Sequence, residues 1–217
     1  MSFNQNTTEE EKMDYRAVAN RCAVSLSSLH LPISREEALI ILSQKGFSLV
    51  EVDIVTLARQ CIGISKYRRG ARLVEAPAIV DCSSFIKWLY AQRGIWLPRR
   101  SIQQYEFGET IGINDIIAGD VVFVSGWINY YRDDPACGVG HVGIASGDGT
   151  IVHATSCNRM PGVMETSLDK FIGKTKFRGV RRYIPKDEEV FTFETPSHRE
   201  IEAADDVKWV VLQSLSK

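Results

Sequence analysis

The spacing of apolar residues changes once along the chain, and this change limits the folds that the sequence can adopt. In the segments 51–61 and 82–92 the apolar residues recur at helical spacing. After Gly119-Asp120 the chain holds short runs rich in β-branched residues, separated by Gly, Asn and Asp. These runs span residues 121–124, 141–145, 151–154 and 178–184. Helices followed by strands predict an α+β fold.

The two ends of the chain differ from this middle part. Residues 1–50 are rather polar and are predicted to be helical, with Ser34 and Glu37 spaced as a capping box before a helix at 36–44. The segment 186–217 is charged and carries one late apolar patch. We therefore expect a helical N-terminal extension (1–50), a central domain (51–185) and a C-terminal segment (186–217) that is either a docked helix or a loose tail.

Composition excludes some classes of partner. The 217 residues include 26 Lys plus Arg and 27 Asp plus Glu, so the net charge is -1 and no global field attracts nucleic acid or an anionic membrane. The N-terminus lacks the basic and apolar stretches of a secretory signal, and five scattered cysteines suit free thiols in a reducing compartment. We expect a cytoplasmic protein with no membrane partner. Export by a specialised route and the oligomeric state stay open.

Cys82 is the candidate nucleophile. It follows Asp81, a predicted N-cap, and so lies in the first turn of the helix at 82–92. Unpaired N–H groups and the helix dipole favour a thiolate there, so we expect the pKa of the thiol to fall below its usual value of about 8.5. On position alone, an inert buried cysteine is the more frequent case.

Two histidines are candidates for the base and its orienting partner. His141 opens the run 141–145 and His153 lies in 151–154, and the turn between these runs predicts a hairpin. A two-residue loop would place the two imidazoles on opposite faces. A three-residue loop, 147–149, places His153 opposite Gly143 and on the same face as His141. Catalysis by a thiol and two histidines requires this second register.

Two other patterns occur around these histidines. Gly138, Gly140 and Gly143 spell G-x-G-x-x-G, but a strand follows in place of the helix that dinucleotide binding needs. Cys137, His141, His153 and Cys157 form a symmetric set of zinc-ligand types, although no common zinc module has this spacing on a hairpin. We therefore expect no metal and no cofactor, and keep a metal-stabilised or degenerate binding domain as the non-enzymatic alternative.

From about residue 57 to 183 the motifs resemble, in chain order, those of the NlpC-type cell-wall cysteine peptidases of bacteria and their phages. The similar segments are Tyr67 with Gly70-Ala71, D-C-S-S-F at 81–85, L-P-R-R-S-I-Q-Q at 97–104, G-D-V-V-F-V at 119–124, H-V-G-I-A at 141–145 and H-A at 153–154. The sequence departs from the family pattern at Ser84, where glycine is usual, and in a longer loop at 127–140.

The resemblance implies a papain-like α+β domain, with helices packed on a small antiparallel sheet, that hydrolyses peptidoglycan stem peptides. The bond implied is the one from γ-D-glutamyl to the diamino acid. Cys82 would attack the carbonyl, His141 would protonate the leaving amine, and His153 would hold the imidazole tautomer. The backbone N–H of Cys82 would meet the oxyanion.

The same resemblance implies substrate contacts. Stem peptides carry carboxylates and often a free amine, so Asp81 and Ser83 are predicted to receive an amine, and Arg99 a carboxylate. Tyr67 is the fourth substrate-binding residue that the resemblance implies. Peptidoglycan-derived peptides are then the partner, in muropeptide recycling, with the loop at 127–134 as a candidate lid. A thiol acyltransferase of the same fold is the alternative enzyme.

Overall fold

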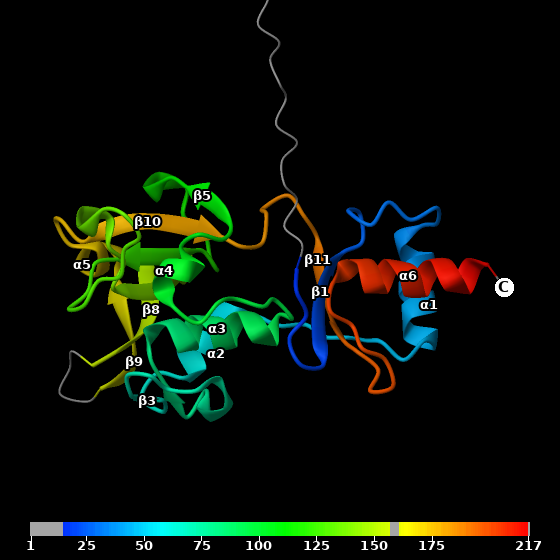
Figure 1. Ribbon diagram of the computed structural model, residues 1–217, viewed down its shortest axis with the longest axis horizontal. Helices are drawn as coiled ribbons and strands as arrows, with labels where there is room; N and C mark the ends of the chain where they lie inside the picture. Colours follow the sequence, from blue (N-terminus) through cyan, green and yellow to red (C-terminus); the bar gives the residue numbers. More distant parts are fainter. Residues whose placement is uncertain (1–14, 157–160, 217) are drawn as a thin grey trace, which may run out of the picture.

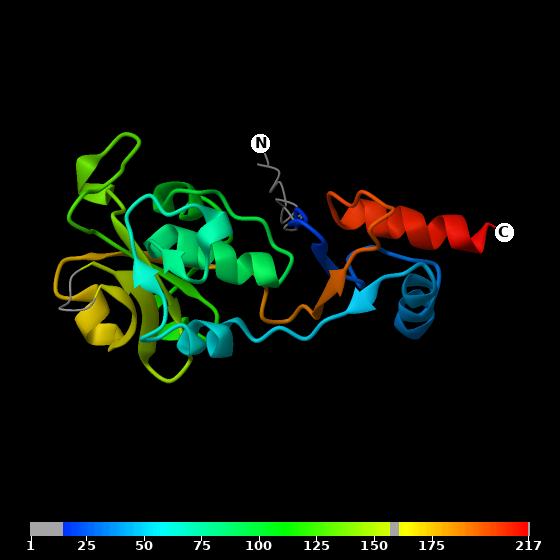
Figure 2. The ribbon, with the colours of Figure 1, turned by 90° about the horizontal axis from the view of Figure 1, so that it is seen from below.

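The structure, a computed structural model, describes residues 15–156 and 161–216, which form a larger and a smaller lobe side by side (Figures 1 and 2). The larger lobe is built on an eight-stranded sheet with the order β4-β3-β9-β8-β7-β6-β10-β5, antiparallel except for the parallel pair β3–β4. Its strands are β3 (Lys66–Tyr67), β4 (Ile79–Val80), β5 (Glu109–Ile111), β6 (Val121–Val124), β7 (His141–Ala145), β8 (Thr150–Thr155), β9 (Gly162–Ser167) and β10 (Phe177–Arg182). The predicted α+β fold is confirmed.

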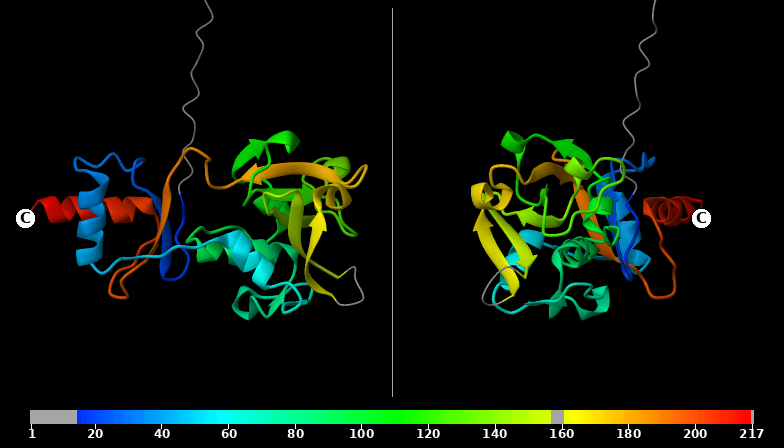
Figure 3. Two further views of the ribbon diagram at one scale, coloured as in Figure 1. Left: turned by 180° about the vertical axis from the view of Figure 1, so that it is seen from behind. Right: turned by 60° about the vertical axis from the view of Figure 1, so that its left-hand side comes forward.

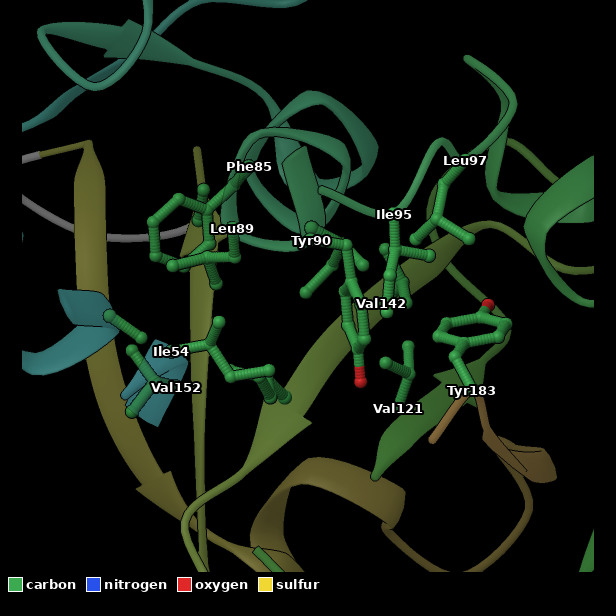
Figure 4. Packing of buried hydrophobic residues seen from close by; sticks show 14 of the residues in the cluster. Ile54, Phe85, Leu89, Tyr90, Ile95, Leu97, Val121, Val142, Val152 and Tyr183 are labelled. Carbon is green, nitrogen blue, oxygen red and sulfur yellow. The ribbon is translucent and has the colours of Figure 1, made fainter. Parts of the chain in front are cut away.

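Strands β6 and β7 are buried along nearly their whole length, which shows that both faces of the sheet are covered there. Helices α2 (Ile54–Gln60) and α3 (Cys82–Gln92) pack on one face, where Phe85 and Leu89 of α3 meet Val142 and Val152 (Figure 4). The short helix α5 (Leu168–Ile172) covers the other face through Phe171. Each such fully buried side chain stabilises the fold by roughly 1.5–3 kcal/mol. The larger lobe also contains the short helix α4 (Ser101–Gln104) and three single turns of 3-10 helix. These turns are η1 (Leu73–Glu75), η2 (Ile113–Asp115) and η3 (Pro135–Cys137).

The smaller lobe is made from the two ends of the described chain. Strand β11 (Val190–Glu194) lies between β1 (Arg21–Ser25) and β2 (Ser48–Leu49), antiparallel to both. Helices α1 (Arg35–Gln44) and α6 (Ala204–Leu215) lie on the side of this sheet that faces away from the larger lobe (Figures 1 and 3). No helix within the described ranges is both long and apolar enough to cross a membrane.

The expected helical extension over residues 1–50 is therefore wrong in its secondary structure. Residues 1–14 lie outside the described residues, and the remainder forms one helix and two strands. The local sequence pattern does not predict strand β1, because its partner strand, β11, belongs to the C-terminal segment. That segment holds a strand as well as the docked helix that we considered. The division of the chain at about residues 50 and 185 stays a prediction.

Helix starts agree better with the sequence, because caps are local. Ser34 and Glu37 form the predicted capping box of α1. Helix α3 begins at Cys82 after its cap, Asp81, as predicted. Helix α2 begins later than predicted, because the side chain of Asp53 accepts hydrogen bonds from the N–H groups of Val55 and Thr56.

The two lobes meet where α3 ends. On the edge of β1 away from β11, the N–H of Ala23 donates to the carbonyl oxygen of Gly94 at 3.2 Å. Arg93 donates to the carbonyl of Val190 at 2.9 Å, and the Thr192 hydroxyl donates to the carbonyl of Arg93 at 3.0 Å. Gly94 has φ +74°, and a Cβ added there would lie 2.5 Å from the carbonyl carbon of Cys22. Only glycine allows β1 to approach this closely.

We expect Gly94→Ala to lower the free energy of unfolding by about 3 kcal/mol, because it adds a backbone clash to the strain of a positive φ. Gly63 is a matched control, since it has the same φ of +74° and open space around its added Cβ. Gly63→Ala should lower the free energy of unfolding only by the strain of the positive φ, about 1 kcal/mol. Urea unfolding of both variants measures the difference, and equal losses would show that Gly94 does not fix the junction.

Candidate active site

A hollow of about 1050 Å³ opens on the larger lobe and gathers every residue that the sequence predicted for the site. Its walls come from α3, from the loop that follows α3, and from β3 and the strands β7, β8 and β9. The predicted residues that line it are Tyr67, Asp81, Cys82, Ser83, Arg99, His141 and His153. They come from segments far apart in sequence, so the fold brings the candidate nucleophile and both histidines together.

Cys82 is fixed by the start of α3. The Asp81 carboxylate accepts from the N–H of Ser84 at 2.8 Å, and the Ser84 hydroxyl accepts from the N–H of Asp81 at 2.8 Å. This reciprocal cap holds the first turn of the helix rigid. The thiol is half-buried and faces the hollow, with backbone hydrogen bonds at Ser83 and Val142.

His141 and His153 have the predicted register. Ile144 pairs with Val152 and Ala145 with Ile151, which leaves a three-residue loop, 147–149. The ring atoms His141 Nε2 and His153 Nδ1 are 2.9 Å apart. Gly143 makes this arrangement possible, because a Cβ there would lie 3.0 Å from the Cβ of His153 and closer still to Ile151.

Two further residues contact the histidine pair, Thr166 of β9 and Phe171 of α5. The second ring nitrogen of His153, Nε2, lies 3.0 Å from the hydroxyl oxygen of Thr166. The ring of Phe171 packs against both imidazoles, with centroid separations of 5.5 Å to His141 and 4.9 Å to His153. Sequence reasoning missed both residues, because their own segments carry no signal of chemistry.

Asp81 and Arg99 form an ion pair beside Cys82. Arg99 contacts both carboxylate oxygens and also donates to the Ser83 hydroxyl at 2.9 Å and to the carbonyl of Ala71 at 2.8 Å. The N–H of Gly70 donates to Asp81 at 2.9 Å. The predicted amine and carboxylate contacts of these side chains stay predictions, and the pair already satisfies most of their hydrogen-bonding groups.

The alternative zinc set is not assembled among the described residues. Cys137 is exposed in η3, donates to Asp134 at 3.4 Å and does not line the hollow, while Cys157 lies outside the described residues. Residues 15–156 and 161–216 contain no group of three or more His, Cys, Asp or Glu side chains placed to share a metal ion. The glycines at 138–143 lead into strand β7, so the helix needed for dinucleotide binding is missing from this motif.

The model of the NlpC/P60 family matches residues 65–182, which is more than half of the chain and includes this whole arrangement. The chain belongs to the NlpC/P60 family. It is 32% identical over 142 residues to a gamma-DL-glutamyl hydrolase of Bacillus subtilis, covering 63% of this chain and 31% of that protein. It is 39% identical over 116 residues to a probable endopeptidase of Corynebacterium glutamicum, covering 54% and 47%.

Among solved structures, NlpC1 from Trichomonas vaginalis is similar, with a TM-score of 0.50 and 27% identity over 60% of this chain and 42% of that one. The chain thus spans about a third to a half of the length of these relatives.

The structure explains one departure from the NlpC/P60 pattern and describes the other. Ser84, where the family pattern has glycine, supplies half of the α3 cap. The longer loop is held at its base, where Tyr130 and Val139 exchange two backbone hydrogen bonds of 2.9 Å. Trp127 lies at the rim of the hollow with 97% of its surface exposed. Movement of this loop as a lid stays a prediction.

The expected acidic thiol is wrong. Burial raises the pKa of Cys82 to about 11, and the Asp81 carboxylate adds to this shift, while the backbone hydrogen bonds and Arg99 only reduce it. Burial likewise lowers the pKa of His141 to about 3, with further lowering by His153 and Lys176. Both shifts favour the neutral forms of the thiol and of the imidazole.

The two histidines should make the protein less stable in acid. Burial lowers the pKa of His153 to about 4 and that of His141 to about 3, against about 6.5 in an unfolded chain. Between these values the unfolded chain binds more protons, so the free energy of unfolding falls as the pH drops below 6.5. We expect a loss of about 1–2 kcal/mol per histidine from pH 7 to pH 5.

Urea unfolding at both pH values measures this loss. His153→Gln should remove its share of the pH dependence, while His198→Gln, which changes an exposed histidine, should keep the dependence of the unchanged protein. An unaltered slope in His153→Gln would contradict the assignment.

Proposed function

We propose that the chain is a cysteine peptidase that hydrolyses peptidoglycan stem peptides at the bond from γ-D-glutamyl to the diamino acid. The observation that carries the proposal is the meeting of Cys82 with the hydrogen-bonded pair His141–His153 in one hollow. Membership of the NlpC/P60 family supports peptide hydrolysis. The name of one relative, a gamma-DL-glutamyl hydrolase, supports a γ-glutamyl substrate, and that of the other, a probable endopeptidase, supports peptide hydrolysis.

In the proposed reaction, Cys82 Sγ attacks the carbonyl carbon while His141 takes the thiol proton. His141 then gives that proton to the leaving amine, the C–N bond breaks, and a thioester remains on Cys82. Water, deprotonated by His141, attacks the thioester and releases the acid and the thiol. The N–H of Cys82, at the start of α3, is the candidate donor to the oxyanion.

The proposed reaction needs one tautomer of His141, and the hydrogen bonds from His141 through His153 to Thr166 can accommodate it. His141 Nε2 contacts His153, so Nδ1 is the nitrogen left for the thiol proton. Nδ1 is unprotonated only if Nε2–H donates to His153 Nδ1. His153 then carries its proton on Nε2 and donates to Thr166. In this scheme Thr166 is a positioning residue, because its hydroxyl oxygen accepts from the Nε2–H that this tautomer of His153 carries.

We propose soluble muropeptides as the substrate and a cytoplasmic recycling role as the setting. The loop at 127–140 stands at the rim of the hollow and favours a short peptide over a chain embedded in the wall. All four cysteines within the described ranges are free thiols, which suits a reducing compartment. Rates on an isolated tetrapeptide and on purified sacculi at matched enzyme test the first part, and cell fractionation tests the second.

Cys82→Ala should lower kcat on defined muropeptides by about a thousandfold or more and leave the thermal midpoint unchanged, because α3 still packs through Phe85 and Leu89. Cys137→Ala, which removes an exposed thiol outside the hollow, is the control and should keep full activity. Mass analysis of the products measures hydrolysis and also detects transfer of the acyl group to an amine. Activity of Cys82→Ala within tenfold of the unchanged enzyme would overturn the nucleophile.

Thr166→Val should lower kcat about tenfold with little change in KM, because it removes the oxygen that accepts from the His153 ring in the reactive tautomer and changes the size of the side chain little. Thr166→Ser keeps the hydroxyl and should restore the rate. Nitrogen chemical shifts of the His153 ring report the tautomer directly. Equal rates for the Val and Ser variants would show that Thr166 has only a packing role.

A further inference from the structure

The hollow carries a strong positive charge in a chain that is almost neutral overall. Its charged lining consists of five cationic side chains and one carboxylate, a net charge of +4, whereas the whole chain has a net charge of -1. The charged lining residues are Arg69, Asp81, Arg99, Arg100, Lys170 and Lys176. Charge of one sign in a concave site concentrates ligands of the opposite sign.

In the part of the chain that the structure describes, a carboxylate pairs with only one of these cations. Asp81 pairs with Arg99. Among residues 15–156 and 161–216, no carboxylate pairs with Arg69, Arg100, Lys170 or Lys176. Four charges of the hollow are therefore left to be met by solvent ions or by a bound ligand.

The four cations without a carboxylate partner among the described residues lie in two parts of the hollow. Arg69 donates to the hydroxyl of Tyr130 at 3.1 Å and Arg100 lies 5.9 Å from the centre of the Tyr130 ring, so both lie on the wall that carries Asp81 and Arg99. Lys170 belongs to α5, next to the Phe171 ring that packs on both imidazoles. Lys176 lines the hollow together with His141, and its charge contributes to the lowered pKa of the imidazole. The two lysines thus lie on the imidazole side of the hollow.

We propose that Lys170 and Lys176 form an anion subsite for a free carboxylate on the residue that follows the scissile bond. This inference rests on the proposed function, in which His141 protonates the leaving amine, so that the leaving residue lies on the imidazole side. On the acyl side, a γ-linked glutamyl residue keeps its α-carboxylate free, and Arg69 and Arg100 are placed to meet it. The enzyme therefore selects stem peptides that are anionic on both sides of the cleaved bond.

A pair of peptides that differ in one charge tests the subsite: L-alanyl-γ-D-glutamyl-L-lysine and its C-terminal amide. We expect kcat/KM to be about fivefold higher for the acid, as two solvent-exposed ammonium groups allow. The preference should fall at high salt, because these charges are screened. Lys170→Gln and Lys176→Gln should each reduce it, and the double variant should abolish it.

Lys174→Gln is the matched control. Lys174 is an exposed lysine in the same loop as Lys176, but it does not line the hollow, so the variant should keep the fivefold preference. A loss of preference equal to that of Lys176→Gln would mean that overall charge, and no defined subsite, discriminates between the peptides.

Binding of the same two peptides to Cys82→Ala, measured by calorimetry, separates the subsite from the proposed function. If the unchanged enzyme cleaves both peptides equally well and Cys82→Ala binds them equally, the subsite is overturned and the peptidase activity stands. If neither peptide is cleaved but the acid binds about fivefold more tightly, the subsite stands and the cleaved bond is wrong. Equal binding without cleavage overturns both.

Discussion

The packing of α3 on strands β7 and β8 is the interaction on which the rest of the site depends. Phe85 and Leu89 lie against Val142 and Val152, and this apolar contact sets how far the helix start lies from the end of the sheet (Figure 4). Cys82 is the first residue of the helix, and Val142 is the second residue of β7, directly after His141. The thiol and the imidazole therefore line the same hollow, because α3 and β7 both begin beside it.

The sequence predicts features that depend on neighbouring residues, and it misses features that depend on residues far apart in the chain. The cap at Asp81 is local, and neighbouring residues predict it. The turn sequence alone leaves the hairpin register open, and the three-residue loop is expected only because catalysis needs both histidines on one face. The pairing of β1 with β11 joins segments near opposite ends of the chain, so helical spacing alone misassigned residues 1–50. The contributions of Thr166 and Lys176 were missed for the same reason: only the folded sheet brings β9 and the loop after α5 to the histidines.

The protonation of the site shows how magnitude decides between two opposing effects. A helix dipole at an N-terminus stabilises a charge by about 0.3–1 kcal/mol, less than one pKa unit. Burial in a protein interior shifts a pKa by up to 3–5 units in the direction of the neutral form. At Cys82 burial wins and raises the pKa to about 11. Burial also favours the neutral imidazole of His141, so the proposed reaction starts with the proton on the sulfur.

The proposed anion subsite connects this resting state to substrate binding. The ammonium group of Lys176 lowers the pKa of His141, because it disfavours a second positive charge nearby. A substrate carboxylate bound to Lys176 would cancel that repulsion and raise the pKa of the imidazole. Proton transfer from Cys82 to His141 would then cost less with the acidic peptide bound than in the empty site. The carboxylate that the lysines select would in this way also help to generate the nucleophile, so a preference for the acidic peptide should appear in kcat as well as in KM.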